Sequence, residues 1–403
     1  MRKSRKREIV GINAKVARNI NRSIILNSIR ERQPISRITI SKMTGLNKST
    51  VSRVVASLIA EDLIVEELDR NEVVGRNPFN LRVKKGTHFV GAICFESART
   101  ELAVVDVDGS IKSKVEIRTE AQNPREFIAR CVNELEKLGT HLNHHRLRGI
   151  GVTVGGIVDS LQSKVVYAPD LGWENLDMGE IIRAVSPDIE MITIENDANA
   201  SALAELLLGK HGLSSSSIVF VFVGYGIGAG IVLDNHILSG SSHAAGEFGH
   251  MTIVERGEQC SCGNQGCWEV YASDHATIRR YVVEKGLSED KCTEIQLSDI
   301  IELAKNEDAI ARSVLSKTAA YIGLGIANII RSFDPQVIII GGSITQAWDL
   351  VYPQIMETVE RRGFFAKQHN TAILPTTLTD SPPLLGAAAL SIRKIFDSRR
   401  IAL

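Results

Sequence analysis

The chain has 403 residues, of which 44% are hydrophobic and 23% are charged. This composition is typical of a soluble globular protein and excludes a disordered chain, and the length predicts two or three domains with separate cores. No apolar run reaches the roughly 18–20 residues of a membrane span, and residues 1–19 are basic without the apolar segment of a signal peptide, so we expect a cytoplasmic protein with reduced thiols and no membrane partner.

The net charge of zero hides two blocks of opposite charge. Residues 1–87 contain 19 Lys and Arg against 8 Asp and Glu, a net charge of +11. The remaining residues contain 28 Lys and Arg against 39 Asp and Glu, a net charge of −11. A basic module joined to an acidic one is expected when only the first module meets a polyanion.

Three helices are predicted in the basic block. Isoleucines recur at helical spacing over residues 19–32, and Pro34 follows them. A second short helix is predicted over residues 35–46, with Gly45 as its break, and a third over residues 47–64, where Asn47 is suited to the N-cap. Three helices with a tight second turn predict a helix-turn-helix.

The third helix and the segment after it favour DNA binding. Polar and basic residues at the start of a recognition helix can reach base edges and phosphates in the major groove. The candidates here are Asn47, Lys48, Ser49, Thr50, Ser52 and Arg53. Residues 64–83 form two β-like runs around a polar turn, which predicts a winged helix with Arg76 able to enter a minor groove. The alternative is a three-helix packing domain with a solvated basic face. It accounts for the periodicity, but not for the charge block, turn and wing together.

Beyond Gly86, predicted strands alternate with helices. Strands are expected over residues 88–97, 101–109, 148–159, 218–234 and 334–344, and a strand runs into a helix over residues 189–210. Strands that end in glycines beside helices, as at Gly155 and Gly156, place backbone N–H groups around a ligand. The sequence therefore predicts an α/β body.

Three segments of this body resemble the ROK family of sugar kinases and sugar-responsive repressors, which has the actin-like ATPase fold. They are ENDANA at residues 195–200, GEFGH at 246–250 and CSCGNQGCWE at 260–269. The resemblance covers about residues 88–403, and the winged helix ahead of it looks like the repressor branch, similar to xylose repressors and to regulators of glucose and N-acetylglucosamine use. It implies a DNA-binding domain at 1–87, a first α/β lobe at 88–195 with a C-terminal helix at 385–403, and a second α/β lobe at 196–384.

Four residues have the spacing of a metal site. Cys260, Cys262 and Cys267 lie within eight residues, and His250 lies ten residues ahead. Thiolates and an imidazole in a reduced compartment indicate Zn²⁺, and four protein ligands leave no open position, so the site should be structural. A disulfide would leave one of the three thiols without a partner. In ROK members that resemble this sequence, the corresponding residues bind zinc.

Such a metal would join the segments that flank it into one sugar pocket. The resemblance implies sugar contacts and a pocket floor formed by Gly155, Gly156, Asn196, Asp197, Glu247, His250 and Glu269. The alternative for Asn196 and Asp197 is a helix N-cap, and both roles can hold at once.

Phosphoryl transfer needs a base and a site for the nucleotide phosphates. By resemblance, Asp197 is the base in kinases of the family. Their Asp-x-Gly-x-Thr turn is replaced here by residues 96–99, Glu-Ser-Ala-Arg, and Tyr225 occupies a position that is usually threonine. We therefore expect no enzyme activity.

The expected function is that of a sugar-responsive repressor. We expect it to bind a palindromic operator as a homodimer, with a tetramer as the alternative assembly, and to release the operator on binding a monosaccharide. The alternatives are an ATP-dependent sugar kinase with Asp197 as base, and a repressor controlled by a protein partner.

Overall fold

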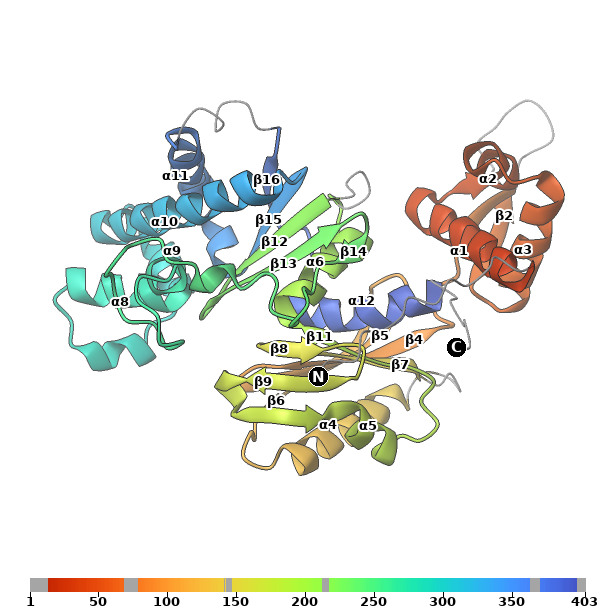
Figure 1. The fold of residues 1–403 in the computed structure, drawn as a ribbon, viewed down its shortest axis with the longest axis horizontal. Coiled ribbons are helices and arrows are strands. Elements are labelled where there is room, and N and C mark those ends of the chain that lie inside the picture. Colours follow the sequence, from red (N-terminus) through yellow and green to blue (C-terminus); the bar gives the residue numbers. More distant parts are fainter. Residues whose placement is uncertain are drawn as a thin grey trace, which may run out of the picture.

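The computed structural model describes residues 14–68, 79–140, 142, 147–211, 217–362 and 370–396. A small N-terminal module, residues 14–83, which we call the head, lies at one end of a larger body with two sheets (Figure 1). Arg76, expected in the wing, lies outside the described residues.

The head contains three helices and three short strands. The helices are α1 (Ala14–Arg32), α2 (Arg37–Thr44) and α3 (Lys48–Ala60), and the strands β1 (Ile35–Ser36), β2 (Ile64–Leu68) and β3 (Phe79–Val83) pair in the order β1-β3-β2. Helix α2 ends at Gly45, whose φ of 69° lies in the left-handed region that glycine adopts without strain. Helix α3 begins at once after Asn47, whose side-chain oxygen accepts from the Thr50 N–H at 2.8 Å.

Helix α1 buries a narrower face than its isoleucine pattern suggests. Ile25 and Ile29 are fully buried, whereas Ile20 and Ile24 are 44% and 40% exposed. The buried face of α1 is instead completed by Leu26, which lies in the same core as Ile25 and Ile29.

The first lobe of the body is a mixed sheet in the order β11-β7-β4-β5-β6. Its strands are β4 (Phe89–Phe95), β5 (Arg99–Asp106), β6 (Ile111–Arg118), β7 (Leu147–Val154) and β11 (Ile192–Asn196). Strands β7 and β11 run parallel to β4. Helices α4 (Pro124–Gly139) and α5 (Met178–Val185) cover one face, together with a small sheet of β8 (Ile157–Asp159), β9 (Lys164–Ala168) and β10 (Trp173–Asp177).

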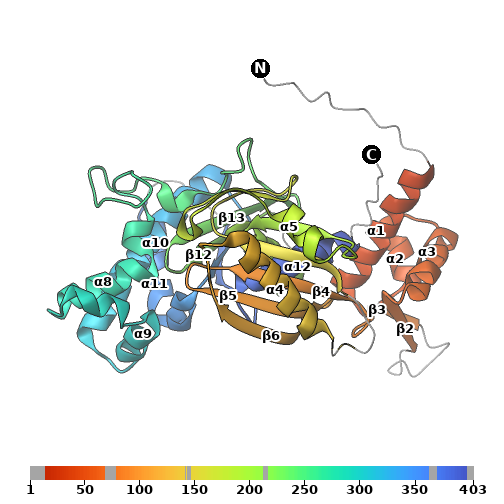
Figure 2. The same ribbon diagram turned by 90° about the horizontal axis from the view of Figure 1, so that it is seen from below.

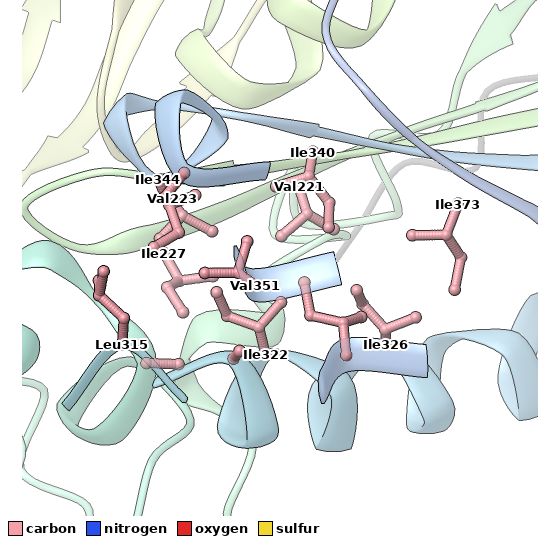
Figure 3. Packing of buried hydrophobic residues seen from close by; sticks show 14 of the residues in the cluster. Val221, Val223, Ile227, Leu315, Ile322, Ile326, Ile340, Ile344, Val351 and Ile373 are labelled. Carbon is pink, nitrogen blue, oxygen red and sulfur yellow. The ribbon is translucent and has the colours of Figure 1, made fainter. Parts of the chain in front are cut away.

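The second lobe has a sheet in the order β14-β13-β12-β15-β16. Its strands are β12 (Ser217–Val223), β13 (Ile227–Leu233), β14 (His236–Ile237), β15 (Val337–Gly341) and β16 (Ala372–Pro375). The accompanying helices are α7 (Glu269–Ala272), α8 (Asp274–Glu284), α9 (Leu297–Lys305), α10 (Ala309–Phe333) and α11 (Trp348–Glu360). Figure 3 shows Val221, Ile227 and Ile340 of the strands packed with Ile322 and Ile326 of α10.

Helix α10 is a core helix. Among the described residues it is the one helix whose length and mean hydropathy of 1.3 would suit a membrane span. However, 61% of its most apolar stretch is buried inside the protein, against the strands of the second lobe and α11.

Helices α6 (Asp197–Leu208) and α12 (Pro382–Phe396) lie between the two sheets (Figure 1). Leu384 and Ala388 of α12 share a core with β4, while Leu385 and Ala389 share one with β12. The helix approaches β7 so closely that a Cβ at Gly151 would lie 1.7 Å from the carbonyl oxygen of Ala387. Helix α12 therefore connects the two lobes through direct packing.

The head is fixed to the first lobe by a continuous core. One hydrophobic cluster runs from α1, α2 and α3 into β4 and α12. The Arg30 guanidinium of α1 lies over the Phe396 ring of α12 at 5.6 Å, and the His88 ring nitrogen Nε2 is 2.9 Å from the Glu61 carbonyl oxygen. The head thus sits beside β4 and the end of α12 (Figure 2).

Replacing Gly151 should loosen the contact between β7 and α12. Gly151→Ala places a methyl group against the α12 backbone, which cannot move as a side chain would, so we expect the free energy of unfolding to fall by about 1–3 kcal/mol. Urea unfolding measures this change. Gly139→Ala is the matched control, because a Cβ there would lie 3.8 Å from its nearest neighbour. Equal stability of the two variants would contradict the close packing.

Candidate functional site

The junction of β11 and α6 places Asn196 and Asp197 beside the glycine pair Gly155 and Gly156. The Asn196 side-chain oxygen accepts from the N–H groups of Ala198 and Asn199 at 2.9 and 3.1 Å, so it caps α6. Its amide nitrogen donates to the Gly156 carbonyl at 3.0 Å. The expected capping role is therefore present, and the same side chain holds the glycine pair of the predicted pocket floor in place.

Asp197 has a carboxylate with a raised pKa and with free space beside one of its oxygens. Burial raises its pKa to about 6, and the negative charges of Glu247 and Glu96 add to the shift. One oxygen accepts from the Ala198 N–H at 2.8 Å. The other would lie 3.6 Å from a Cβ at Gly155, so the missing side chain at Gly155 leaves space beside this oxygen.

The other expected sugar contacts lie on the second lobe. Glu247 precedes the short 3-10 turn Phe248–His250, and Glu269 is the first residue of α7. Partial burial raises the pKa of Glu247, while His250 lowers it and Glu269 raises it, so these three groups are electrostatic neighbours. Part of the Glu247 side chain nevertheless remains exposed to solvent and hence to a ligand. Because the charge of Glu247 also raises the pKa of Asp197, the structure brings Asp197, Glu247, His250 and Glu269 close to one another, with Asn196 adjacent to Asp197 in the chain.

Glu269 is held by the backbone of the second lobe. Its Oε2 atom accepts from the Ile227 N–H at 2.9 Å. A Cβ at Gly226 would lie 2.3 Å from the same oxygen, so a side chain at that position of the turn between β12 and β13 would displace the Glu269 carboxylate. Glycine at this position therefore leaves the carboxylate free to accept from the Ile227 N–H.

The four expected metal ligands form one cluster. Their ligand atoms all lie within 4.8 Å of one another. The distance from Cys262 Sγ to Cys267 Sγ is 3.7 Å, and from Cys260 Sγ to His250 Nδ1 it is 3.6 Å. Tetrahedral zinc with Zn–S bonds of about 2.3 Å requires sulfur atoms about 3.8 Å apart, so the donor set fits this ion.

The four metal-ligand candidates lie in a loop that has little regular secondary structure. Two isolated β-bridges, Thr252 with Cys267 and Gln259 with Gln265, are its main strand-like pairings. Trp268, which follows Cys267, is fully buried and donates from its indole N–H to the Tyr321 carbonyl at 2.7 Å. Zinc bound here would fix the spacing between His250 and Glu269.

The remaining cysteines lie outside this cluster. Cys94 and Cys131 are buried, and burial raises the pKa of Cys131 to about 12, as expected for unreactive core thiols. All three cysteines lie outside any metal-ligand spacing, which predicts ordinary buried thiols; for Cys292, which is only partly buried, this prediction is wrong. It lies on the short turn Glu289–Thr293 between α8 and α9, where no helix covers it fully.

The turn between β4 and β5, at residues 96–99, differs from a phosphate-binding turn. Between β4 and β5, the Glu96 N–H donates to the Arg99 carbonyl at 3.0 Å, and the Arg99 side chain donates to the Glu96 carboxylate at 2.9 Å. This turn presents a carboxylate, which disfavours a polyphosphate, and Arg99 is already paired with it. Across the cleft, the Tyr225 side chain is 77% exposed on the turn between β12 and β13.

Glu195 begins the ENDANA segment that the sequence singled out, whereas Asp274 and His275 were missed by sequence reasoning. Glu195, almost fully buried, accepts from the Asn196 N–H at 2.9 Å and from the Asn199 amide at 3.3 Å, so it braces the start of α6. Asp274 and its neighbour His275 begin α8 directly after the metal loop. An Asp-His pair just beyond the cysteine cluster is the sequence signal that could have drawn attention to them.

The second candidate surface is the outer face of α3. Asn47, Lys48, Ser49, Ser52 and Arg53 are exposed there, and Thr50 is half-buried. The opposite face, with Val51, Val55 and Leu58, lies in the head core. The side-chain oxygen of Asn47 is occupied by the cap, so only its amide nitrogen remains to donate to DNA.

Comparison with known proteins gives a consistent result. Residues 92–394 match the ROK family. The chain is 31% identical over 382 residues to the xylose repressor of Bacillus spizizenii, with 94% of this chain and 97% of the repressor aligned.

Two solved structures extend the comparison. A ROK family transcriptional regulator, described as a homologue of the Escherichia coli Mlc protein, has a TM-score of 0.80 at 28% identity and covers 94% of this chain and 97% of its own. A ROK family glucokinase from Streptomyces griseus, solved with glucose and AMPPNP, has a TM-score of 0.65 at 27% identity and covers 75% of this chain and 98% of its own. From the family match and these likenesses, the chain belongs to the ROK family.

Proposed function

We propose that this protein is a sugar-responsive transcriptional repressor, whose head binds a double-stranded DNA operator and whose body binds a monosaccharide. The observation that carries the proposal is the continuous core that joins the basic head to the first lobe and to α12. The alignment with the xylose repressor, over 97% of that protein's length, supports it. The glucokinase structure covers only 75% of this chain.

In this proposal the head is a winged helix-turn-helix and α3 is its recognition helix. Lys48, Ser52 and Arg53 would reach bases or phosphates in the major groove, because they project from the first two turns of α3 on its exposed side. The short sheet β1-β3-β2 is the base of the wing. Two heads of a homodimer would read a palindromic operator through a shared two-fold axis.

The sugar would bind between Asp197 and the carboxylates of Glu247 and Glu269. Carboxylates accept hydrogen bonds, and sugar hydroxyls donate them, so a sugar offsets the repulsion among these like charges. Zinc at His250, Cys260, Cys262 and Cys267 would be structural, because four protein ligands complete a tetrahedral shell. It holds the loop of Glu247 against the segment of Glu269.

Helices α6 and α12 offer a route from the sugar to the head. Asn196 and Asp197 stand at the start of α6, α6 packs along α12, and Phe396 at the end of α12 contacts Arg30 of the head. A sugar that favours one arrangement of these helices releases the operator only if its affinity differs between the two arrangements. Sugar affinity must then be lower in the operator complex than in free protein.

A sugar kinase is the second candidate, favoured by the raised pKa of Asp197, which suits a general base. The Glu96 carboxylate and the exposed Tyr225 on the nucleotide side argue against it. A coupled assay for ADP release with D-glucose, D-xylose and N-acetylglucosamine decides between them. Turnover would favour the kinase, and a repressor controlled only by a protein partner would bind none of these sugars.

Arg53→Ala should weaken operator binding. Operator fragments can be selected from random-sequence DNA with the full-length protein and tested by fluorescence anisotropy. A lost base contact should cost about 1–3 kcal/mol on the selected sequence, whereas a lost phosphate contact should weaken binding to all DNA and lower the salt dependence. Arg125→Ala on α4 is the control for charge alone. Normal binding by Arg53→Ala would exclude α3 as the recognition helix in the sense proposed.

Cys262→Ser should remove zinc and sugar binding together. Loss of one thiolate opens the metal shell, and the loop carrying Glu247 then loses its fixed position. Metal content is measured by mass spectrometry, and sugar binding by the rise in Tm with each of the three sugars. Cys292→Ser, a cysteine outside the cluster, is the control. Full sugar affinity in zinc-free protein would show that the pocket does not depend on the metal.

Sugar affinity should rise with pH through about 6. The folded pKa of Asp197 lies near 6, and hydroxyl groups donate to the ionised form, so the affinity is fully present above this pKa and lost below it. At pH 5 only about a tenth of the groups are ionised, which predicts roughly tenfold weaker binding than at pH 7.5. Calorimetry at both values measures the change. Asp197→Asn should bind weakly with a flat pH profile; an unchanged slope in this variant would assign the titration to another group.

A further inference from the structure

Two exposed aromatic side chains, Tyr225 and His275, lie together beside the turn between β12 and β13. Tyr225 stands at the tip of the turn between β12 and β13 and is 77% exposed. Its ring lies 5.2 Å from the His275 ring, centroid to centroid, with an angle of 43° between the planes. His275, on α8, is also exposed. An exposed pair of rings beside a cleft is typical of a surface that a ligand covers.

The pair is tied to the proposed sugar site through the backbone. Tyr225 is followed by Gly226, whose absent Cβ would lie 2.3 Å from Glu269 Oε2. On the other side, the Asp274 N–H donates to the Gly224 carbonyl at 2.8 Å, which joins the start of α8 to the same turn. The residues that carry the two rings are therefore direct chain neighbours of groups that contact Glu269 or the turn beside it.

Asp274, the residue before His275 in α8, has a buried carboxylate oxygen without a hydrogen-bond partner among the described residues. The Asp274 Oδ1 atom is inaccessible to solvent and makes no hydrogen bond with the described residues. Burial raises the pKa of this carboxyl to about 7, which reflects the cost of its isolation. Such a group gains most from a hydroxyl donor. A phosphate would bring further negative charge to Asp274 and Glu269, so the ligand at this position should be uncharged.

We propose that Tyr225 and His275 form a stacking platform for a second sugar ring, so that the preferred ligand of the cleft is a disaccharide or longer glycoside. A pyranose ring offers an apolar face of C–H groups to an aromatic ring and hydroxyls at its edge, which matches two exposed rings next to an unpartnered carboxylate. This inference rests on the proposed function, in which the first ring binds at Asp197, Glu247 and Glu269.

Calorimetry of the full-length protein with matched sugars tests the platform. The pairs are D-xylose and xylobiose, D-glucose and cellobiose or maltose, and N-acetylglucosamine and chitobiose. We expect one disaccharide to bind at least about tenfold more tightly than its monosaccharide. Tyr225→Ala should remove this difference and leave the monosaccharide affinity unchanged, because the tyrosine contacts only the second ring. Tyr225→Phe should keep it, since the ring face remains. His275→Ala should reduce it.

Val283→Ala is the matched control, because Val283 is 68% exposed near the other end of α8. Equal affinity for each disaccharide and its monosaccharide would overturn the platform but leave the proposed sugar sensor intact. Loss of monosaccharide affinity in Tyr225→Ala would also overturn it, since the side chain would then belong to the first-ring site. Binding of no sugar by the wild-type protein would reject the proposed function itself. A change of oligomeric state in Tyr225→Ala, seen by sedimentation, would assign the rings to a contact between copies.

Discussion

Helix α12 lies so close to both β7 and α6 that neither Gly151 nor Gly386 has room for a side chain. A Cβ at Gly386 would lie 2.6 Å from the Ala200 carbonyl carbon, and one at Gly151 would meet the α12 backbone. Backbone atoms in such contact cannot adjust as side chains do, so a shift of α6 must be accompanied by a shift of α12 or by a gap in the core. The cleft residues at the start of α6 and the head at the end of α12 are therefore attached to one stiff unit.

The cleft itself brings together acidic groups that repel one another. The negative charge of Glu247 raises the pKa of Asp197, the negative charge of Glu269 raises the pKa of Glu247, and burial raises the pKa of both Asp197 and Glu247. Hydrogen bonds from backbone N–H groups, such as that of Ile227 to Glu269, offset part of this cost. The remainder is relieved by a ligand that donates hydrogen bonds without adding negative charge. A polyhydroxyl compound meets this requirement, and a nucleotide does not.

Patterns local in the sequence predicted much of this structure. Apolar runs indicated the strands around residues 88–97 and 218–234, and the spacing of His250 and the three cysteines indicated the metal cluster. Contacts between distant segments carry no such pattern. The bond from the Asn196 amide to the Gly156 carbonyl and the isolation of Asp274 depend on how the lobes pack. Helical spacing predicted the first helix, although periodicity cannot say how wide its core-facing stripe is, and Ile20 is 44% exposed.

The attachment of the head limits how a sugar could act on DNA binding. Because the head shares a core with β4 and α12, it moves with the first lobe. If a sugar draws the two lobes together, the second lobe changes position relative to the first, and therefore relative to the head. In a dimer, that motion alters the separation of the two heads only if the copies contact each other through their second lobes. A dimer joined through the first lobes would keep its heads fixed in place, and the sugar could then release DNA only by loosening the core between α1 and α12.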